Sequence, residues 1–235
     1  MTHIIGVDIE TTSTNSEGRL IQIGMATMRG NEPVVFAQDV IYQLTEAGSF
    51  EIQAEALEVN GFTLDRIFGS KEKFPYVTRN PHTVAEAACV WLKDMFPLPE
   101  NHIAELRAQH EAESSSEKQD ASRPKPLAWY INQAYRKRFI ALGWNVGSFD
   151  LPFIHRDLPQ LGQYMHYRTI DLNAVCFAAA EVTGDSYEYV KEEAKEYAAG
   201  NFQSDATWHD AGYDAATSLL SYEYLIEKMS QLPDA

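Results

Sequence analysis

Three short apolar runs at the start of the chain predict three strands. Residues 3–9 are rich in β-branched side chains, which is typical of a strand buried on both faces. Residues 20–28 and 33–41 follow the same pattern, and turn-forming residues at 29–31 separate them. The polar segment 11–18 provides another turn, so we expect the three strands to form an antiparallel meander.

Apolar residues at helical spacing follow the meander. They predict helices over 51–59, which an Asn-Gly pair ends, and over 82–96. The charged segment 185–199 is predicted to be an exposed helix. A stripe at four- and three-residue spacing predicts a final helix over 211–229 whose core-facing residues are Ala215, Leu219, Tyr222, Ile226 and Met229.

Strand and helix patterns alternate in the second half of the chain. This alternation favours parallel strands added to the meander, because a helical crossover joins parallel neighbours. The predicted elements are a helix over 127–135, a strand over 139–144, a helix over 148–157, a strand over 167–170 and a helix over 172–182.

The stretch 97–126 has a different composition from the rest of the chain. Ser, Glu, Gln and Pro dominate it, and nothing apolar recurs after Leu106. We therefore expect a single domain over 1–235 that carries a mobile insertion over 97–126. A partner-binding arm and a tolerated loop are both consistent with this composition.

Composition and charge narrow the class of protein. The 235 residues include 34 acidic and 19 basic side chains, a net charge of −15, which argues against nucleic-acid binding by bulk electrostatics. An enzyme whose carboxylates hold cations escapes that objection. The sequence has no apolar run of ~20 residues and no signal-like start, so we expect a cytoplasmic protein without a membrane span. Cys89 and Cys176 are predicted to be buried free thiols.

Acidic residues stand at the ends of predicted elements in separate parts of the chain. Asp8 and Glu10 lie two positions apart at the end of the first strand, so both side chains project from one face. Adjacent like charges are unfavourable unless a cation or a proton lies between them. Asp150 falls in the first turn of the helix over 148–157, which Ser148 is expected to cap, and a purely stabilising role fits it equally well.

His209 and Asp214 form a third group near the start of the last helix. Five helical steps place two side chains about 140° apart, so His209 is expected on the preceding loop. Each pairing alone arises by chance about once per chain of this composition or less often, and only the combination is informative.

Four carboxylates and one histidine at one sheet edge would suit two hard divalent cations, Mg²⁺ or Mn²⁺. Two such ions ~4 Å apart can hold the attacking and leaving oxygens of a phosphoryl displacement. A histidine beside them can take a proton from the attacking water. The combination predicts a two-metal phosphodiesterase.

These motifs resemble those of the DEDDh branch of the DnaQ-like 3′–5′ exonucleases, which includes proofreading subunits, ribonuclease T and oligoribonuclease. IIGVDIETTS carries Asp8 and Glu10, GWNVGSFDLPF carries Asp150, and HDAGYDAATSLL carries His209 and Asp214. The tyrosine branch has Tyr four positions before the last Asp, where this chain has an aspartate. The resemblance implies an RNase H-like α/β fold, with a mixed five-stranded sheet flanked by helices.

The resemblance also implies residue roles. Asp8, Glu10, Asp150 and Asp214 would bind two divalent cations, Mg²⁺ or Mn²⁺, and His209 would be the general base. The family removes mononucleotides from the 3′ ends of single-stranded nucleic acid.

Four more residues match positions that line the family's substrate site: Thr11, Asn60, Phe62 and Asn145. Phe62 could stack on a base, although an aromatic residue after a helix stop is more often part of the core. Thr11 and Asn145 could instead serve only as a turn residue and a strand-end cap.

Substrate and partners stay open at this point. DNA is favoured over RNA because DIETT resembles proofreading enzymes. An RNA-trimming exoribonuclease, a phosphoesterase for small substrates and a non-catalytic accessory protein are the alternatives. A homodimer and a replication-protein partner are both compatible with the sequence. The basic cluster 136–138 either follows the nucleic-acid backbone or is a solvated helix end.

Overall fold

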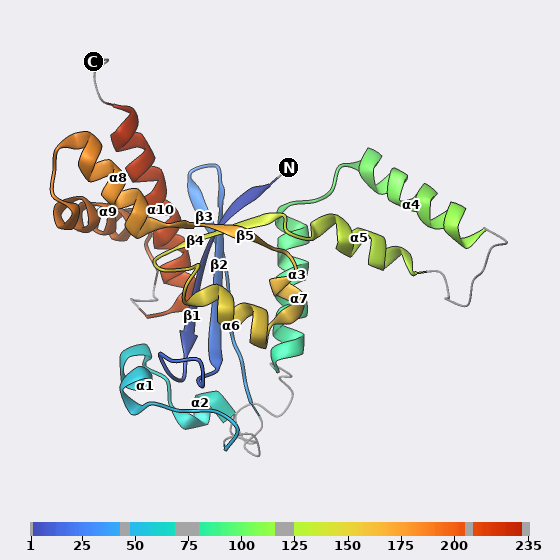
Figure 1. The fold of residues 1–235 in the computed structure, drawn as a ribbon, viewed down its shortest axis with the longest axis horizontal. Coiled ribbons are helices and arrows are strands. Elements are labelled where there is room, and N and C mark those ends of the chain that lie inside the picture. Colours follow the sequence, from blue (N-terminus) through green and yellow to red (C-terminus); the bar gives the residue numbers. More distant parts are fainter. Residues whose placement is uncertain (1, 43–47, 69–79, 116–124, 205–208, 232–235) are drawn as a thin grey trace.

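A mixed sheet forms the centre of the molecule. The computed structural model describes residues 2–42, 48–68, 80–115, 125–204 and 209–231 (Figure 1). The strands in these residues form a five-stranded sheet in the order β3-β2-β1-β4-β5. Their bounds are β1 His3–Thr11, β2 Leu20–Arg29, β3 Glu32–Asp39, β4 Phe139–Gly143 and β5 Met165–Asp171.

The three predicted N-terminal strands form the antiparallel half of the sheet. β1 pairs with β2, where Asp8 lies opposite Gly24, and β2 pairs with β3. β4 and β5 add in parallel, with Ile5 of β1 opposite Ala141 of β4. The central position of β1 explains its apolar, β-branched sequence, because both of its faces are covered. The antiparallel meander and its parallel extension are both confirmed.

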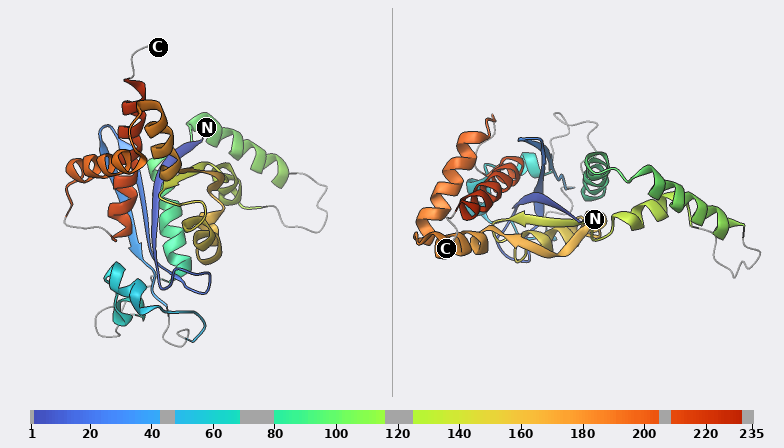
Figure 2. Two further views of the ribbon diagram at one scale, coloured as in Figure 1. Left: turned by 60° about the vertical axis from the view of Figure 1, so that its left-hand side comes forward. Right: turned by 90° about the horizontal axis from the view of Figure 1, so that it is seen from above.

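Helices cover the two faces of the sheet (Figure 2). On one face, α10 (Ala211–Ser230) crosses β1, β2 and β3, and α8 (Leu172–Thr183) and α9 (Tyr187–Asn201) pack beside it. The main hydrophobic core lies on the other face, beneath α3 (Pro81–Met95) and α6 (Asp150–Asp157). The remaining short helices are α1 (Ala54–Asn60), α2 (Leu64–Phe68) and α7 (Pro159–Gly162).

Two glycines let α10 lie unusually close to the sheet. A Cβ atom on Gly6 would stand 2.1 Å from the carbonyl oxygen of Ala215, and one on Gly24 would stand 1.9 Å from that of Ala211. Both separations are far shorter than any real carbon–oxygen contact, so only glycine fits at these positions. The first turns of α10 are thereby held against the end of β1.

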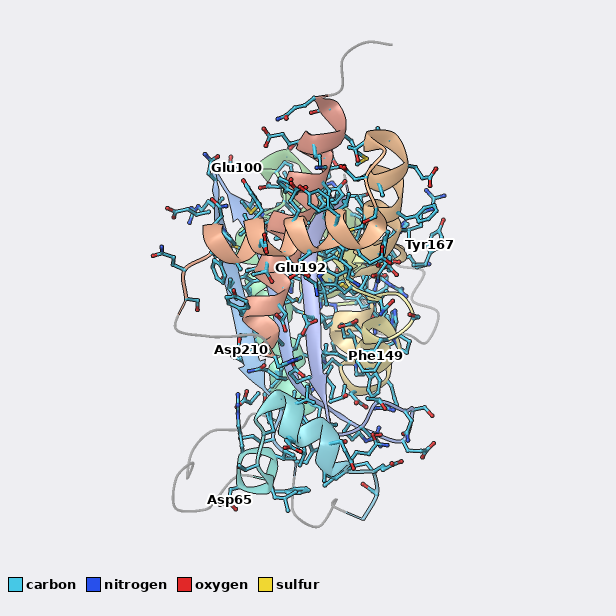
Figure 3. All side chains as sticks on the ribbon, turned by 90° about the vertical axis from the view of Figure 1, so that its left-hand side faces the viewer. Asp65, Glu100, Phe149, Tyr167, Glu192 and Asp210 are labelled. Atoms are coloured by element: carbon cyan, nitrogen blue, oxygen red, sulfur yellow. The ribbon has the colours of Figure 1, made fainter. Side chains whose placement is uncertain are left out.

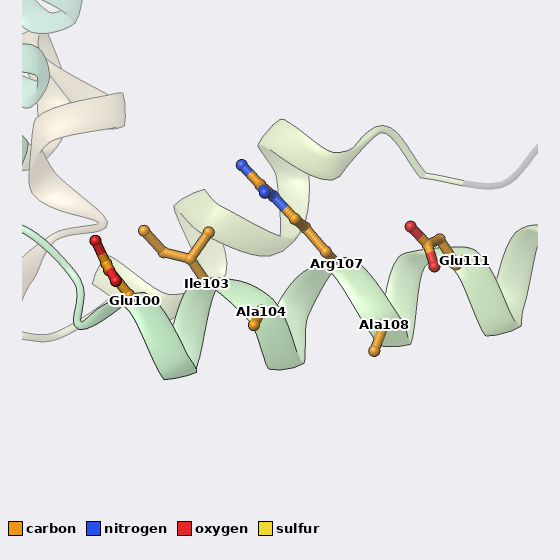
Figure 4. A pocket seen from close by; sticks show the side chains of 6 residues that line it. All are labelled: Glu100, Ile103, Ala104, Arg107, Ala108 and Glu111. Carbon is orange, nitrogen blue, oxygen red and sulfur yellow. The ribbon is translucent and has the colours of Figure 1, made fainter.

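The segment predicted as a mobile insertion is helical over Glu100–Ser114 (α4). α4 packs against α5 (Leu127–Tyr135), and the two helices project from the body as an arm (Figure 1). The Tyr130 hydroxyl donates a hydrogen bond to Glu113 across the arm. Side chains along one side of α4 border a shallow pocket (Figure 4). Part of the predicted insertion, 116–124, lies outside the described residues.

The buried residues of two helices, α10 and α9, differ from the prediction. Ile226 is 44% exposed and the neighbouring Leu225 is fully buried, so the expected core position in the second half of α10 is wrong by one residue. α9 is not wholly exposed, because Val190, Ala194 and Ala198 are buried against its neighbours.

Other expectations hold in the described residues. Cys89 and Cys176 are buried free thiols, as predicted. None of the helices in this part of the chain combines the length and the apolar character that crossing a bilayer requires.

Candidate active site

The residues of the three sequence motifs meet at the carboxyl end of β1. Asp8 and Glu10 share the strand face of Gly6, which is the face that α10 covers. α10 begins there and carries Asp214 in its first turn, while Asp150 is the first residue of α6. In Figure 3, the labelled Asp210 and Phe149 mark where α10 and α6 start, on either side of the strand end.

The two carboxylates of β1 are packed among other acidic groups. Glu10 is only 7% exposed, and burial together with the charges of Asp214 and Asp150 raises its pKa to about 8. The charge of Arg66 lowers the pKa of Glu10 and so partly offsets this rise. Burial, and then the charges of Asp150, Asp214 and Glu10, raise the pKa of Asp8 well above its usual range. Negative charge on the pair is therefore unfavourable unless a cation or a proton is bound.

Asp150 reaches the same site from the start of α6. It is 3% exposed, and burial raises its pKa to about 8, although the backbone N–H groups of Asp150 and Ile9 partly offset this effect. The expected cap of α6 is wrong, because Ser148 donates its hydroxyl to the carbonyl oxygen of Asn145 instead. Phe149 occupies the N-cap position and makes no side-chain cap.

His209 lies on the loop before α10, as its spacing from Asp214 requires. Its backbone has a φ of 69°, in the left-handed region, and its N–H donates a hydrogen bond of 2.9 Å to Oδ2 of Asp214. The other oxygen of Asp214, Oδ1, is buried and has no hydrogen-bond partner among the described residues. Burial raises the pKa of Asp214 to about 6.

This donor set fits a divalent cation. Glu10, His209 and Asp214 each offer one ligand atom, and these atoms lie within 4.8 Å of one another. A buried carboxylate oxygen without a donor, surrounded by further carboxylates, is an acceptor that a cation would satisfy. Ligands that are mostly oxygen suit Mg²⁺ or Mn²⁺. Asp150 and Asp8 adjoin this group, because the charge of Asp150 raises the pKa of Glu10 and of Asp8, and the charges of Asp214 and Glu10 raise that of Asp8.

The site also contains charged groups that the sequence did not indicate. Asp210 caps α10 by accepting hydrogen bonds from the N–H groups of Gly212 and Tyr213, and its charge adds to the acidic cluster. Arg66 forms a two-point ion pair with Asp39, at 2.8 and 2.9 Å, and Lys195 lowers the pKa of Asp214. An aspartate just before an apolar helical stripe is a recognisable cap, but no local pattern marks Arg66 or Lys195.

Two of the four expected substrate residues, Thr11 and Asn60, connect β1 to α1. Asn60 donates its side-chain amide to the carbonyl oxygen of Thr11, and the Thr11 hydroxyl donates to the carbonyl oxygen of Ser13. The bond from Asn60 holds the end of α1 beside the end of β1. Contact of Thr11 and Asn60 with a substrate stays a prediction.

The other two expected substrate residues differ in exposure. Phe62 is 5% exposed, and the guanidinium of Arg66 lies 3.7 Å from the centre of its ring, as a core position would allow. Stacking of Phe62 on a base would require Arg66 to move. Asn145 is exposed, has a φ of 58° and accepts a hydrogen bond from Asn173, so its side chain is open to solvent in the loop before α6.

Comparisons with known proteins support the fold. No family model matches the chain, and no curated protein matches it by sequence. Among solved structures, Escherichia coli exonuclease I is 14% identical with a TM-score of 0.50, over 97% of this chain and 41% of that chain. The same enzyme in complex with a dT13 oligonucleotide matches at 14% identity and a TM-score of 0.50, over 98% and 42%.

A full-length 3′-exonuclease is also similar, at 10% identity and a TM-score of 0.47, over 97% of this chain and 84% of that chain. The chain spans about two fifths of the length of exonuclease I. At such identities the likeness concerns the fold, and the expected RNase H-like architecture is confirmed.

Proposed function

We propose that this protein is a metal-dependent 3′–5′ exonuclease of the DEDDh type, which hydrolyses phosphodiester bonds at the 3′ end of single-stranded nucleic acid. The observation that carries the proposal is the convergence of Glu10, Asp214 and His209 around an unpartnered buried oxygen, beside Asp8 and Asp150. The fold shared with exonuclease I supports the same proposed activity.

Each residue has a distinct task in this proposal. Asp8, Glu10, Asp150 and Asp214 would hold two divalent cations. When bound, those cations would neutralise charge on the scissile phosphate and on the attacking and leaving oxygens. His209 would accept a proton from the attacking water, and its exposed side chain can reach both substrate and solvent. The bond from its backbone N–H to Asp214 keeps the imidazole beside the carboxylates.

Single-stranded DNA is the favoured substrate in this proposal. Exonuclease I has been crystallised with dT13, and the DIETT motif resembles proofreading enzymes. Discrimination from RNA would depend on contacts with the 2′-hydroxyl group. Asn145 is a candidate for such a contact, because its side chain is exposed in the loop between β4 and α6, the helix that begins with Asp150.

Digestion of matched 5′-labelled DNA and RNA oligonucleotides tests the proposal. With Mg²⁺ or Mn²⁺, we expect a ladder that shortens from the 3′ end, no products in EDTA, and faster digestion of DNA. Asp8→Asn should abolish cleavage and also the rise in melting temperature that the cation causes, since a ligand stabilises the state that binds it.

Glu181→Gln is the matched control, because it removes an exposed carboxylate of α8 and should leave both results unchanged. Intact oligonucleotides under every metal condition would reject the exonuclease. Full activity of Asp8→Asn would reject the assigned site.

A further inference from the structure

A pocket of about 500 Å³ lies at the opposite end of the sheet from the carboxylates. We call it the cation pocket, because three consecutive basic residues, Arg136, Lys137 and Arg138, line it between α5 and β4. Leu98 contributes an apolar wall. β1 begins beside the pocket and ends at the acidic site. A strand rises about 3.3 Å per residue, so the two sites lie roughly 20 Å apart.

The cations of this pocket have no acidic partners. Among the described residues, none of the three forms an ion pair, in a protein whose net charge is −15. Nε of Arg138 is buried and has no hydrogen-bond partner among the described residues. A buried guanidinium N–H is nearly always satisfied in native proteins, so this atom indicates an acceptor that comes from outside the chain.

Hydrogen bonds from distant segments hold the backbone that carries the three cations. Lys137 has a φ of 52°, a left-handed conformation that is unfavourable for a residue with a Cβ atom. Its N–H donates to the carbonyl oxygen of Gln163, and the N–H of Arg138 donates to that of Tyr164. The His3 N–H donates to the carbonyl oxygen of Arg138. A strained backbone conformation that neighbouring residues hold in place, next to a cluster of binding groups, is typical of a functional site.

The chemistry of the pocket selects its ligand. Three adjacent cations are best neutralised by an anion with more than one charge and several acceptor oxygens, and guanidinium groups bind phosphate through paired hydrogen bonds. The volume suits a nucleotide-sized molecule, and Leu98 offers a surface for its apolar part. We propose that the cation pocket binds the phosphate of a nucleotide, either free or within a polynucleotide strand. This proposal does not depend on cleavage at the acidic site.

Calorimetric titration in EDTA tests the cation pocket while the acidic site binds no metal. The probes are inorganic phosphate, a 5′-mononucleotide and an oligonucleotide without terminal phosphates, each added to full-length Asp8→Asn protein. We expect at least one nucleotide probe to bind. Adding Arg138→Gln should weaken that binding about tenfold or more, the usual effect of losing a charge-assisted hydrogen bond.

Lys137→Gly gives an independent test that does not endanger the fold. Glycine suits the left-handed backbone at this position, so the variant should unfold at no lower temperature than the parent and yet bind phosphate several-fold more weakly. Lys125→Gln, which removes a charge just before the other end of α5, is the matched control and should bind like the parent.

The probes also separate the two sources of phosphate. Tighter binding of the mononucleotide indicates a site for free nucleotide. Tighter binding of the oligonucleotide, with an affinity that falls steeply as salt is added, indicates a contact for the strand. The proposal is overturned if no probe binds, or if Arg138→Gln and Lys137→Gly both bind like the parent. None of these binding outcomes requires that the acidic site cleave nucleic acid.

Discussion

The two ends of β1 carry opposite charges that are built in different ways. At the carboxyl end, acidic groups from β1, α6 and α10 converge, and Oδ1 of Asp214 lacks a donor. At the amino end, three consecutive residues supply the cations, and Nε of Arg138 lacks an acceptor. Each end thus holds a buried polar atom whose partner is missing from the described residues.

The difference shows how much a charged site depends on the fold. The three cations of the cation pocket come from one stretch of sequence, and the carbonyl oxygens of Gln163 and Tyr164 hold their backbone. The acidic cluster requires α10 to lie against β1 and β2, which Gly6 and Gly24 permit. Damage to the fold should therefore weaken binding at the acidic end more than binding at the cation pocket.

The largest effect should follow the loss of His209. If chemistry belongs only to the acidic end, His209→Ala should slow DNA cleavage by about 10² to 10⁴, the usual contribution of a general base. The cation-dependent rise in melting temperature should persist, because the carboxylates remain. His110→Ala, which removes a histidine from the arm, should leave the cleavage rate unchanged. Cleavage by His209→Ala at the wild-type rate would contradict the role of the histidine.

A smaller but substantial effect should follow an added methyl group at Gly24. In Gly24→Ala the new Cβ would collide with the Ala211 carbonyl, and overpacking of this kind costs about 1–3 kcal/mol. Chemical unfolding should show this loss, and cation binding should weaken as α10 shifts. Phosphate binding at the other end should be retained. Gly48→Ala is the control, since its Cβ would meet no atom within 4 Å. Equal stability of the two variants would show that α10 has room to move.

The smallest effect concerns the pH dependence of stability without metal. Burial raises the pKa of Glu10 and Asp150 to about 8 and of Asp214 to about 6, above their values in an unfolded chain. The folded protein then retains more protons, so its free energy of unfolding should fall as pH rises from about 4 to 8. Saturating Mg²⁺ should suppress this fall.

The amino end should respond to pH with the opposite sign. Burial and then the charge of Arg138 lower the pKa of His3, so its contribution to stability is lost as pH falls below about 6.5. Denaturant unfolding without metal, measured from about pH 4 to 8, tests the acidic end. In Asp150→Asn, the free energy of unfolding should fall less steeply with rising pH than in the parent protein. An unchanged slope in Asp150→Asn would contradict the proposed cause.

The sheet could be predicted from the sequence because its strands are apolar and rich in β-branched residues. The central β1 and the meander follow directly from that pattern. α4 could not be predicted, because its apolar spacing ends at Leu106 and its packing comes from α5, including Tyr130. In α10, alternating spacing allowed either Leu225 or Ile226 to face the core, and only the packing of α8 and α9 decides between them.

The candidate site was predictable where its residues stand in local motifs. Asp8 and Glu10 lie near the end of a strand. The other three residues, Asp150, His209 and Asp214, lie at or just before the start of a helix, and the resemblance to exonucleases connects all five. Their assignment as ligands stays a prediction. The charges of Arg66 and Lys195 reach the site from α2 and α9 through contacts across long sequence distances, which spacing does not encode.

The position of α10 has a consequence for the protein during its synthesis. Asp8 and Asp214 lie 206 residues apart, so the ribosome has made the first pair of carboxylates long before the last. At about 5–20 residues per second, roughly 10–40 s pass between them. Throughout that time α10 is absent, and β1 has only an incomplete set of ligands. A nascent chain therefore cannot assemble the acidic cluster until α10 has been synthesised.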